Sequence, residues 1–366
     1  MRTQEYIGPV LSGIASLQNL AHQWYLDMSL TWPVQPPVNK LDLHHHLVPP
    51  FYAQAVADAG GDPSGWPTPK WSPSSSRMIM KHLGVQSAIL SVTAPGACIV
   101  HDPVEQAKLA RQLNEYAAGI RNEDHHSFGF FASLPDITNT TAAIAEIEYA
   151  FDTLGADGVT LFTRYGPNGT YLGNAAVEPV WKELDRRGAT VFVHPTHPVN
   201  TELVNPLMPQ PVVDYPHETT RTALDMITSR TLTKYPNVKV VLSHAGGTLP
   251  FLASRVLTLM MQKSSAMPWL STGPTHNEAV EAIRSFYYDV ALSTSPQQLR
   301  ALLDLVPEEH IVYGSDFPYA PSSAYPVFLE QLESYDMSSA LRDKVNFANA
   351  QALIPRLGKQ LDISEL

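Results

Sequence analysis

The sequence is poor in cysteine and in basic residues. Cys98 is the only cysteine among 366 residues, so no disulfide can form within the chain. This favours a reducing compartment, and we expect a cytoplasmic protein in which Cys98 is a small buried residue. Only 24 Lys and Arg stand against 35 Asp and Glu, and the formal charge is -11 at pH 7. Because no run of Lys and Arg offers a basic face, we expect no nucleic-acid partner.

Two further patterns are absent. No apolar run approaches the roughly 18 to 20 residues that a membrane span requires, so we expect no membrane insertion. No glycine-rich turn follows an early strand, as a dinucleotide-binding fold would normally show. A composition of 44% hydrophobic and 16% charged residues is ordinary for a globular protein. We expect one domain at residues 39–366, preceded by a partly helical N-terminal extension at residues 1–38.

Short apolar segments alternate with helix-like segments over most of the chain. This alternation predicts a parallel sheet, and eight repeats predict a distorted (β/α)8 barrel, with an open doubly wound sheet as the alternative. The long connections at 49–77 and 196–217 would then lie at the carboxyl ends of the strands, as a lid and a pocket wall. The predicted strands are residues 41–46, 87–92, 128–134, 158–162, 190–194, 238–244, 286–290 and 311–316. The predicted helices include residues 103–122, 140–154, 178–187, 219–234, 279–285 and 297–305.

Several predicted strands end in histidine or aspartate. His44 and His46 alternate at the end of the first strand, so they share one face, while His45 points the other way. In a barrel, side chains at the carboxyl ends of the strands converge however far apart they lie in the sequence. We therefore expect one cluster of five side chains: His44, His46, His194, His244 and Asp316.

Three imidazoles and a carboxylate suit a divalent ion such as zinc and leave a position for water or substrate. We predict one metal ion, with zinc as the first choice, bound by His44, His46, His194 and Asp316. His244 would then be the neighbouring base or proton carrier.

The chain resembles the amidohydrolase superfamily, and within it the branch typified by aminocarboxymuconate-semialdehyde decarboxylase. The matching motifs are Asp42-Leu-His44-His-His46, the strand-end His194, Ser243-His244-Ala-Gly-Gly and Gly314-Ser-Asp316-Phe-Pro. The resemblance implies a distorted barrel, a single divalent metal and non-oxidative decarboxylation without an organic cofactor. The loops 60–66, 91–96 and 216–220 look like those of fungal 6-methylsalicylate decarboxylases. The fourth predicted strand lacks the lysine that binuclear relatives use, which favours one metal.

The resemblance also suggests how the substrate is bound. Arg255 follows His244 by eleven residues, a spacing similar to that of a family arginine that reaches across a dimer interface to a substrate carboxylate. We therefore expect a homodimer or a dimer of dimers, and a surface or helix-capping role is the alternative for Arg255. Further candidate substrate contacts are Arg77, Arg164, Trp66, His197, His217 and Phe317.

The predicted reaction converts a small hydroxylated aromatic acid, similar to 6-methylsalicylate, into CO2 and a phenol. We expect Asp316, supplied with a proton by His244, to protonate the ring carbon that bears the carboxylate. A variant uses hydroxide that His244 generates at the metal. Two alternatives remain open: a mononuclear hydrolase of a lactone or amide, and a non-catalytic metal-binding barrel.

Overall fold

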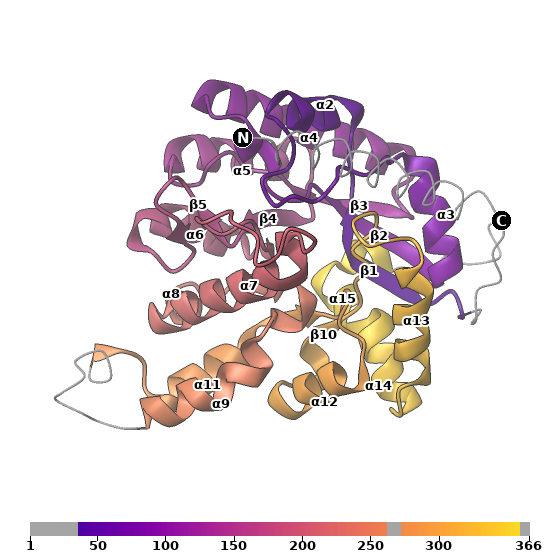
Figure 1. Cartoon of the computed structure of the whole chain (residues 1–366), viewed down its shortest axis with the longest axis vertical. Coiled ribbons are helices and arrows are strands. Elements are labelled where there is room, and N and C mark those ends of the chain that lie inside the picture. The colour runs from indigo at the N-terminus through magenta and orange to yellow at the C-terminus, as the bar shows by residue number, and fades with distance from the viewer. Residues whose placement is uncertain (1–35, 262–271, 359–366) are drawn as a thin grey trace.

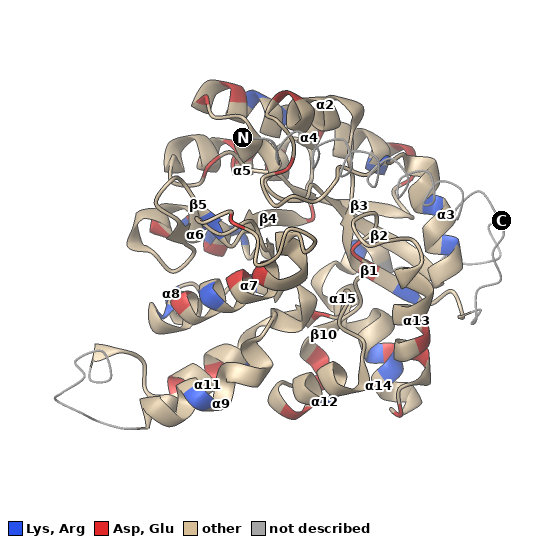
Figure 2. Cartoon of the chain, viewed as in Figure 1, with Lys and Arg blue, Asp and Glu red and all other residues tan. Residues whose placement is uncertain are grey.

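The computed structural model describes residues 36–261 and 272–358. The predicted helical extension lies almost entirely outside these residues. Figure 1 shows strands gathered at the centre of the molecule and helices arranged around them. Within the described residues, no helix is both long enough and apolar enough to cross a membrane. Acidic and basic residues are interspersed along the outer helices (Figure 2).

Eight strands form one sheet in the order β1-β2-β3-β4-β7-β8-β9-β10, and every ladder in it is parallel. The chain thus forms a nearly closed barrel, as predicted. The strands are β1 Lys40–His46, β2 Val85–Ser91, β3 Phe128–Ala132, β4 Gly158–Phe162, β7 Thr190–His194, β8 Lys239–Leu242, β9 Tyr287–Asp289 and β10 Ile311–Val312, and a separate hairpin pairs β5 Arg164–Tyr165 with β6 Thr170–Tyr171.

The barrel closes between β10 and β1 without a regular ladder. The Leu43 N–H donates to the Tyr313 carbonyl at 3.1 Å, and the Asp316 N–H donates to the His44 carbonyl at 2.8 Å. Farther along, His45 and Phe317 form an isolated parallel bridge. We call this contact of β1 with residues 313–317 the seam. It brings residues 270 to 272 positions apart to one place, beside the two alternating histidines.

The barrel interior explains the apolar strands. Interior residues form a cluster that is separate from the larger core beneath the helices: Leu41, Leu43, Ile89, Phe131, Phe192, Val241, Val312, Ala350, Ile354 and Leu357. On β1, Leu41 and Leu43 belong to this interior, yet His44 also faces it, against the Phe192 ring at 4.8 Å. In a regular strand, neighbouring residues such as Leu43 and His44 point to opposite faces, so both could not face the interior. The register of β1 against β2 shifts between Asp42 and His45, which allows it. An irregularity in β1 therefore turns the histidine pair inward.

The main helices agree with the prediction, with two corrections. The helix predicted at 219–234 begins nine residues earlier, at Gln210. Pro209 is its N-cap, and Pro211 lies in its first turn, where proline is favourable. The connection predicted as a long loop at 49–77 contains a complete helix and the start of another. The helices are α2 Pro50–Asp58, α3 Pro73–Leu83, α4 Pro103–Glu123, α5 Thr140–Asp152, α6 Glu178–Arg187, α7 Gln210–Thr228, α8 Thr231–Lys234, α9 Leu249–Met260, α11 His276–Ser285, α12 Pro296–Leu305, α13 Ala324–Ser334, α14 Ser339–Asp343 and α15 Asn349–Leu353.

Candidate metal centre and catalytic cavity

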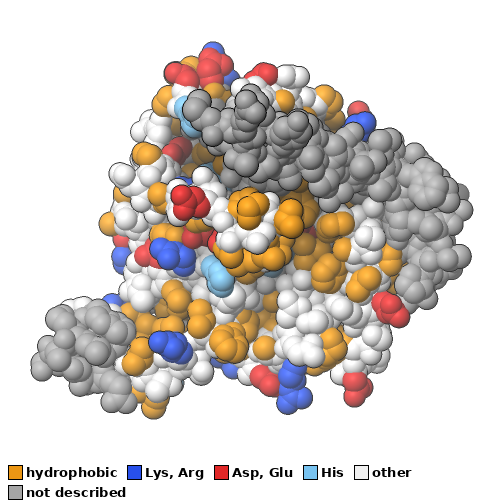
Figure 3. Space-filling model, viewed as in Figure 1, with side chains coloured by type: hydrophobic (Ala, Val, Ile, Leu, Met, Phe, Trp, Pro, Cys, Tyr) orange, Lys and Arg blue, Asp and Glu red, His pale blue; other side chains and the backbone are white. Residues whose placement is uncertain are grey.

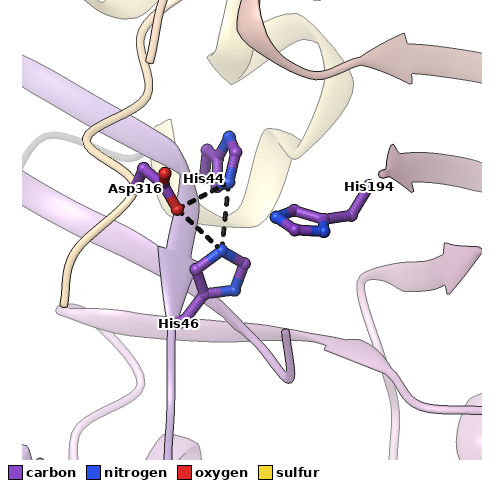
Figure 4. Close-up of side chains that lie close together, drawn as sticks. All are labelled: His44, His46, His194 and Asp316. Carbon is purple, nitrogen blue, oxygen red and sulfur yellow. Dashed lines mark hydrogen bonds and ion pairs between the residues drawn. The ribbon is translucent and has the colours of Figure 1, made fainter. Parts of the chain in front are cut away.

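The alternating pair of β1 meets Asp316 at the seam. The His44 and His46 Nε2 atoms are 3.0 Å apart, and the Asp316 Oδ1 atom lies 3.2 Å from the first and 3.1 Å from the second. His194, at the end of β7, points its ring toward the same place (Figure 4). One potential ligand atom from each of the four residues lies within 4.8 Å of the others, and all four side chains are buried. The structure thus brings the four predicted ligands together.

Hydrogen bonds at the far side of each ring set the histidine tautomers. His44 Nδ1 lies 2.9 Å from Asp289 Oδ2, His46 Nδ1 lies 3.2 Å from the Ser91 carbonyl, and His194 Nδ1 lies 2.7 Å from the Pro195 carbonyl. Carbonyl and carboxylate oxygens only accept, so each Nδ1 carries hydrogen. In the neutral rings each Nε2 then presents a lone pair to the shared centre, which is how metal-binding histidines are arranged.

The donor set fits a divalent cation. Asp316 Oδ1 is buried and has no hydrogen-bond partner, and it faces two Nε2 atoms that would repel it as neutral acceptors. Burial lowers the pKa of His44, but the carboxylates of Asp289 and Asp316 outweigh burial and raise it to about 10. Burial raises the pKa of Asp316, but the charge of His44 outweighs it and holds the pKa well below its usual range. A positive charge between these side chains therefore stabilises the cluster, and a proton or a metal ion can supply it.

Asp289 is a central residue that the sequence analysis missed. It ends β9, and its Oδ1 accepts the His244 N–H at 3.0 Å and the Ala291 N–H at 2.9 Å, while Oδ2 bonds to His44. One buried carboxylate therefore orients a ligand of the metal site and the backbone of His244. The available signal was a charged residue at the end of an otherwise apolar and aromatic predicted strand.

His244 stands beside the cluster, as predicted for a proton carrier. Its Nδ1 lies 3.0 Å from the Ala291 carbonyl, which leaves Nε2 facing Asp316 Oδ2 at 3.9 Å. His244 and Asp316 both have left-handed backbone conformations, with φ of 55° and 60°. Each such conformation costs on the order of 1–3 kcal/mol in a residue other than glycine, and such strain is concentrated at functional sites.

A cavity of about 450 Å³ opens beside these residues, a volume typical of small-molecule sites. His194, His244 and Asp316 line it, together with aromatic side chains and the carboxyl group of Asp62. No lysine or arginine of the described residues lines it. The cavity walls are formed by Asp62, Ser64, Trp66, Thr93, His194, Pro211, Val212, Tyr215, Pro216, His244, Gly247, Leu292, Ser293, Gln298, Asp316, Tyr319, Ala320, Pro321, Ala324 and Phe328. On the face seen in Figure 3, hydrophobic side chains gather near the centre.

Among the predicted substrate contacts, Trp66 lines the cavity, whereas Phe317 does not. Phe317 is fully buried, with its ring 5.1 Å from that of His45. Arg164 lies outside the cavity lining, because its Nε donates to the His197 carbonyl at 2.6 Å and its Nη2 donates to the Pro198 carbonyl at 3.0 Å. His197 itself is half-buried, with Nδ1 3.2 Å from Thr196 Oγ1.

Three predicted contacts lie at the surface of the protomer. Arg77, on α3, is exposed and pairs with Asp124 at 3.2 Å. His217 is exposed on α7, and Arg255 is exposed on α9. The described chain alone therefore does not bring these three side chains into the cavity, and their contact with substrate stays a prediction.

The comparisons with known proteins agree with this site. The amidohydrolase family pattern matches residues 41–356. A 6-methylsalicylic acid decarboxylase of Penicillium expansum is 49% identical over 327 residues, which cover 89% of this chain and 99% of that protein. A crystal structure described as amidohydrolase II has a TM-score of 0.78 at 30% identity and covers 86% of this chain and 99% of its own.

A more distant solved structure shares the fold. It is a dihydroxybenzoic acid decarboxylase from Polaromonas sp. JS666 with bound manganese and the inhibitor 2-nitroresorcinol. Its TM-score is 0.72 at 21% identity, with 87% of this chain and 97% of its own covered. Together, the family match, the 49% identical relative and the barrel show that the chain belongs to the amidohydrolase family.

Proposed function

We propose that the protein is a metal-dependent, non-oxidative decarboxylase of a small hydroxylated aromatic acid, similar to 6-methylsalicylate. The observation that carries the proposal is the position of Asp316. It belongs to the histidine cluster, lines an aromatic cavity and lies 3.9 Å from His244. One residue thus joins the metal centre, the substrate space and a proton carrier. The 49% identical relative, named a 6-methylsalicylic acid decarboxylase, supports this substrate class.

The metal residues would be His44, His46, His194 and Asp316, with zinc as the first choice and manganese as the second. A bound divalent ion would supply positive charge that favours the phenolate form of the substrate, and the phenolate oxygen would raise the electron density on the ring. Manganese in the Polaromonas structure keeps that metal as a candidate.

The chain's own residues would move the proton. His244 would supply the proton to Asp316, since its Nε2 lies 3.9 Å from Asp316 Oδ2. Delivery to the ring carbon that bears the carboxylate breaks aromaticity. The C–C bond then cleaves, its electrons return to the ring, and CO2 leaves. The alternative route, hydroxide generated by His244, uses the same histidine.

The aromatic side chains would bind the ring and exclude water. Trp66, Tyr215 and Tyr319 line the cavity, and Tyr319 and Tyr215 lie edge-on to His46 and His194 with ring centroids 5.4 and 6.3 Å apart. We propose Trp66 as a direct substrate contact.

The substrate carboxylate lacks a basic partner among the described residues of one protomer. We therefore propose a homodimer in which Arg255 of each copy reaches the cavity of the other. Arg255 is exposed and forms no ion pair within the described part of the chain. On α9, Phe251 and Leu259 stand one turn away on either side, 86% and 42% exposed, and form an apolar face suited to a second copy. The single cysteine still favours a cytoplasmic location.

The test is a screen for CO2 release by the purified, metal-analysed protein over salicylate-type acids, with lactones as the comparison substrates. We expect CO2 and a phenol from acids that carry a hydroxyl group ortho to the carboxylate. Ring-opened acid from a lactone with no CO2 from any benzoate would instead identify a hydrolase. Metal binding without either product would identify a non-catalytic barrel.

A further inference from the structure

A chain of buried hydrogen bonds lies behind the metal ligands, on the outer side of β1. Asp42 Oδ1 accepts the N–H groups of His44 and Ser315 at 3.1 and 3.0 Å. Asp42 Oδ2 lies 3.0 Å from His45 Nδ1, and His45 Nε2 lies 2.9 Å from Ser76 Oγ. The Trp71 Nε1–H donates to Ser76 Oγ at 2.8 Å and ends the chain.

The two ends of this chain fix its direction. The indole N–H only donates and the carboxylate only accepts, so the hydroxyl of Ser76 accepts from Trp71 and donates to His45 Nε2. His45 Nδ1–H then donates to Asp42. Every donor in the series is paired, and Asp42, His45 and Ser76 are fully buried. Such a network is costly to break, because each lost partner leaves a buried polar group unpaired.

The acceptor end of the chain acts on the metal ligands. Asp42 Oδ1 accepts a hydrogen bond from the His44 N–H at the point where the register of β1 shifts and His44 turns into the barrel. The same oxygen takes the Ser315 N–H, one residue before Asp316. A single carboxylate oxygen therefore joins two of the three segments that supply predicted ligands, at the seam where no regular ladder holds them.

The donor end of this series of hydrogen bonds lies in a loop that lines the cavity. This loop, residues 59–72 between α2 and α3, contributes Asp62, Ser64 and Trp66 to the cavity wall and ends beside Trp71. It is also tied to α7, since the Gln210 N–H donates to the Ser64 carbonyl at 3.1 Å. We call residues 59–72 the lid loop.

We propose that Asp42 is a positioning residue for the metal site, and that the series Trp71, Ser76, His45 and Asp42 couples the lid loop to the spacing between Asp316 and the histidine pair. Asp42 and His45 belong neither to the group of predicted metal ligands nor to the cavity lining. They act through the backbone of His44 and Ser315.

The test measures metal affinity by chelator competition and the visible spectrum of the cobalt-substituted full-length protein, so it does not depend on which reaction is catalysed. We expect Asp42→Asn to weaken metal binding about 10- to 100-fold, as loss of groups that orient ligands does. Trp71→Phe removes the terminal donor and keeps a ring, and should weaken binding about 2- to 10-fold with a changed cobalt spectrum. In the double variant, the Trp71→Phe effect should largely disappear, since the link is already broken.

Two results would overturn the proposal. One is a Trp71→Phe effect that is absent, or that adds fully to that of Asp42→Asn. The other comes from a matched control, Glu146→Gln, which alters a buried carboxylate bonded to Arg111 and Asn114 away from the site. This control should lower Tm and leave metal affinity unchanged, and an equal loss of metal affinity would mean that Asp42→Asn acts only by general destabilisation. If Asp42→Asn does not fold, Ser76→Ala replaces it, with the same expectation for its double variant with Trp71→Phe.

Discussion

The two sides of the barrel hold the active site in different ways. On one side, β7 pairs with β4 over four consecutive residues, and His194 is the last residue of that ladder. On the other side, β10 pairs with β9 over only two residues, and Asp316 follows in irregular backbone with φ of 60°. There, side-chain carboxylates accept hydrogen bonds from backbone N–H groups in place of a regular ladder. Asp289 accepts from the His244 N–H, and Asp42 accepts from the Ser315 N–H. The regular side supplies one predicted ligand, His194, whereas the irregular side supplies the other three and, in the proposed mechanism, the groups that move a proton.

Replacing a ligand on the regular side should have the largest effect. His194→Ala removes one of the four predicted metal ligands from a buried site, so the remaining three would bind the cation more weakly. We expect loss of stoichiometric metal and a fall in kcat/KM of about 10³-fold or more. Metal analysis and CO2 release on the same preparation measure both. An active, metal-free variant would contradict the assignment.

On the irregular side, His244→Asn should separate metal binding from chemistry. The side chain does not belong to the group of four ligands, so metal content should be retained. Loss of the proton carrier should lower kcat about 10²- to 10⁴-fold, the range of general acid–base catalysis, with little change in KM. A loss of metal that parallels the loss of kcat would show that His244 is a ligand.

Asp289→Asn tests the residue that bonds to both the His44 ring and the His244 backbone. It keeps an acceptor for the backbone N–H groups but weakens the bond that orients His44. We expect metal affinity to fall about 10- to 100-fold and activity to recover when metal is added in excess. Activity that stays low at saturating metal would place the main role of Asp289 at His244 instead.

Arg255→Ala addresses substrate binding across subunits. We expect KM to rise about 10-fold with kcat within a few-fold of the original value, since a carboxylate contact made equally in the ground and transition states acts on binding alone. Arg186→Ala is the matched control, because Arg186 is an exposed arginine on α6 that pairs with Glu183 at 2.6 Å and is not a predicted substrate contact. Mixed oligomers of Arg255→Ala with His194→Ala should regain activity, and their failure to do so would contradict action across the interface.

The smallest expected effect is on the pH dependence of stability. Burial, with the nearby charge of Arg164, lowers the pKa of His197 to about 4. Between about pH 6.5 and 4 the unfolded chain binds a proton that the folded chain does not, so stability falls as pH decreases through this window. Over this pH range, the free energy of unfolding of His197→Gln should fall by about 1 kcal/mol less than that of the original protein. This figure is discounted because His197 is partly exposed to solvent. Denaturant unfolding at pH 7 and pH 4.5 measures the difference, and equal losses would contradict it.

The same contrast explains what could be predicted from the sequence. The barrel and the four clustered ligands could be predicted, because apolar strands alternate with helices and because polar residues at the strand ends converge. The start of α7 could not, since a loop rich in proline also contains Pro211 at a favourable first-turn position. Asp289 was missed because its partners are His44 and the His244 backbone, far away in the sequence.

The shift in β1 was also invisible in the sequence. Leu41 and Leu43 alternate as interior residues, and nothing in their spacing shows that His44 will join them inside. The sequence places Asp42 in a motif but does not predict its role, because its hydrogen bond to Ser315 depends on how the barrel closes. Residues that hold other residues are therefore harder to predict from one sequence than residues that bind a ligand.

The most direct test of metal-dependent decarboxylation is CO2 release from 6-methylsalicylate before chelation, after removal of metal, and after stepwise return of zinc or manganese. The account predicts that activity disappears with the metal and returns in proportion to the ion bound, up to one per chain. Undiminished release of CO2 from protein shown to hold no metal would contradict it.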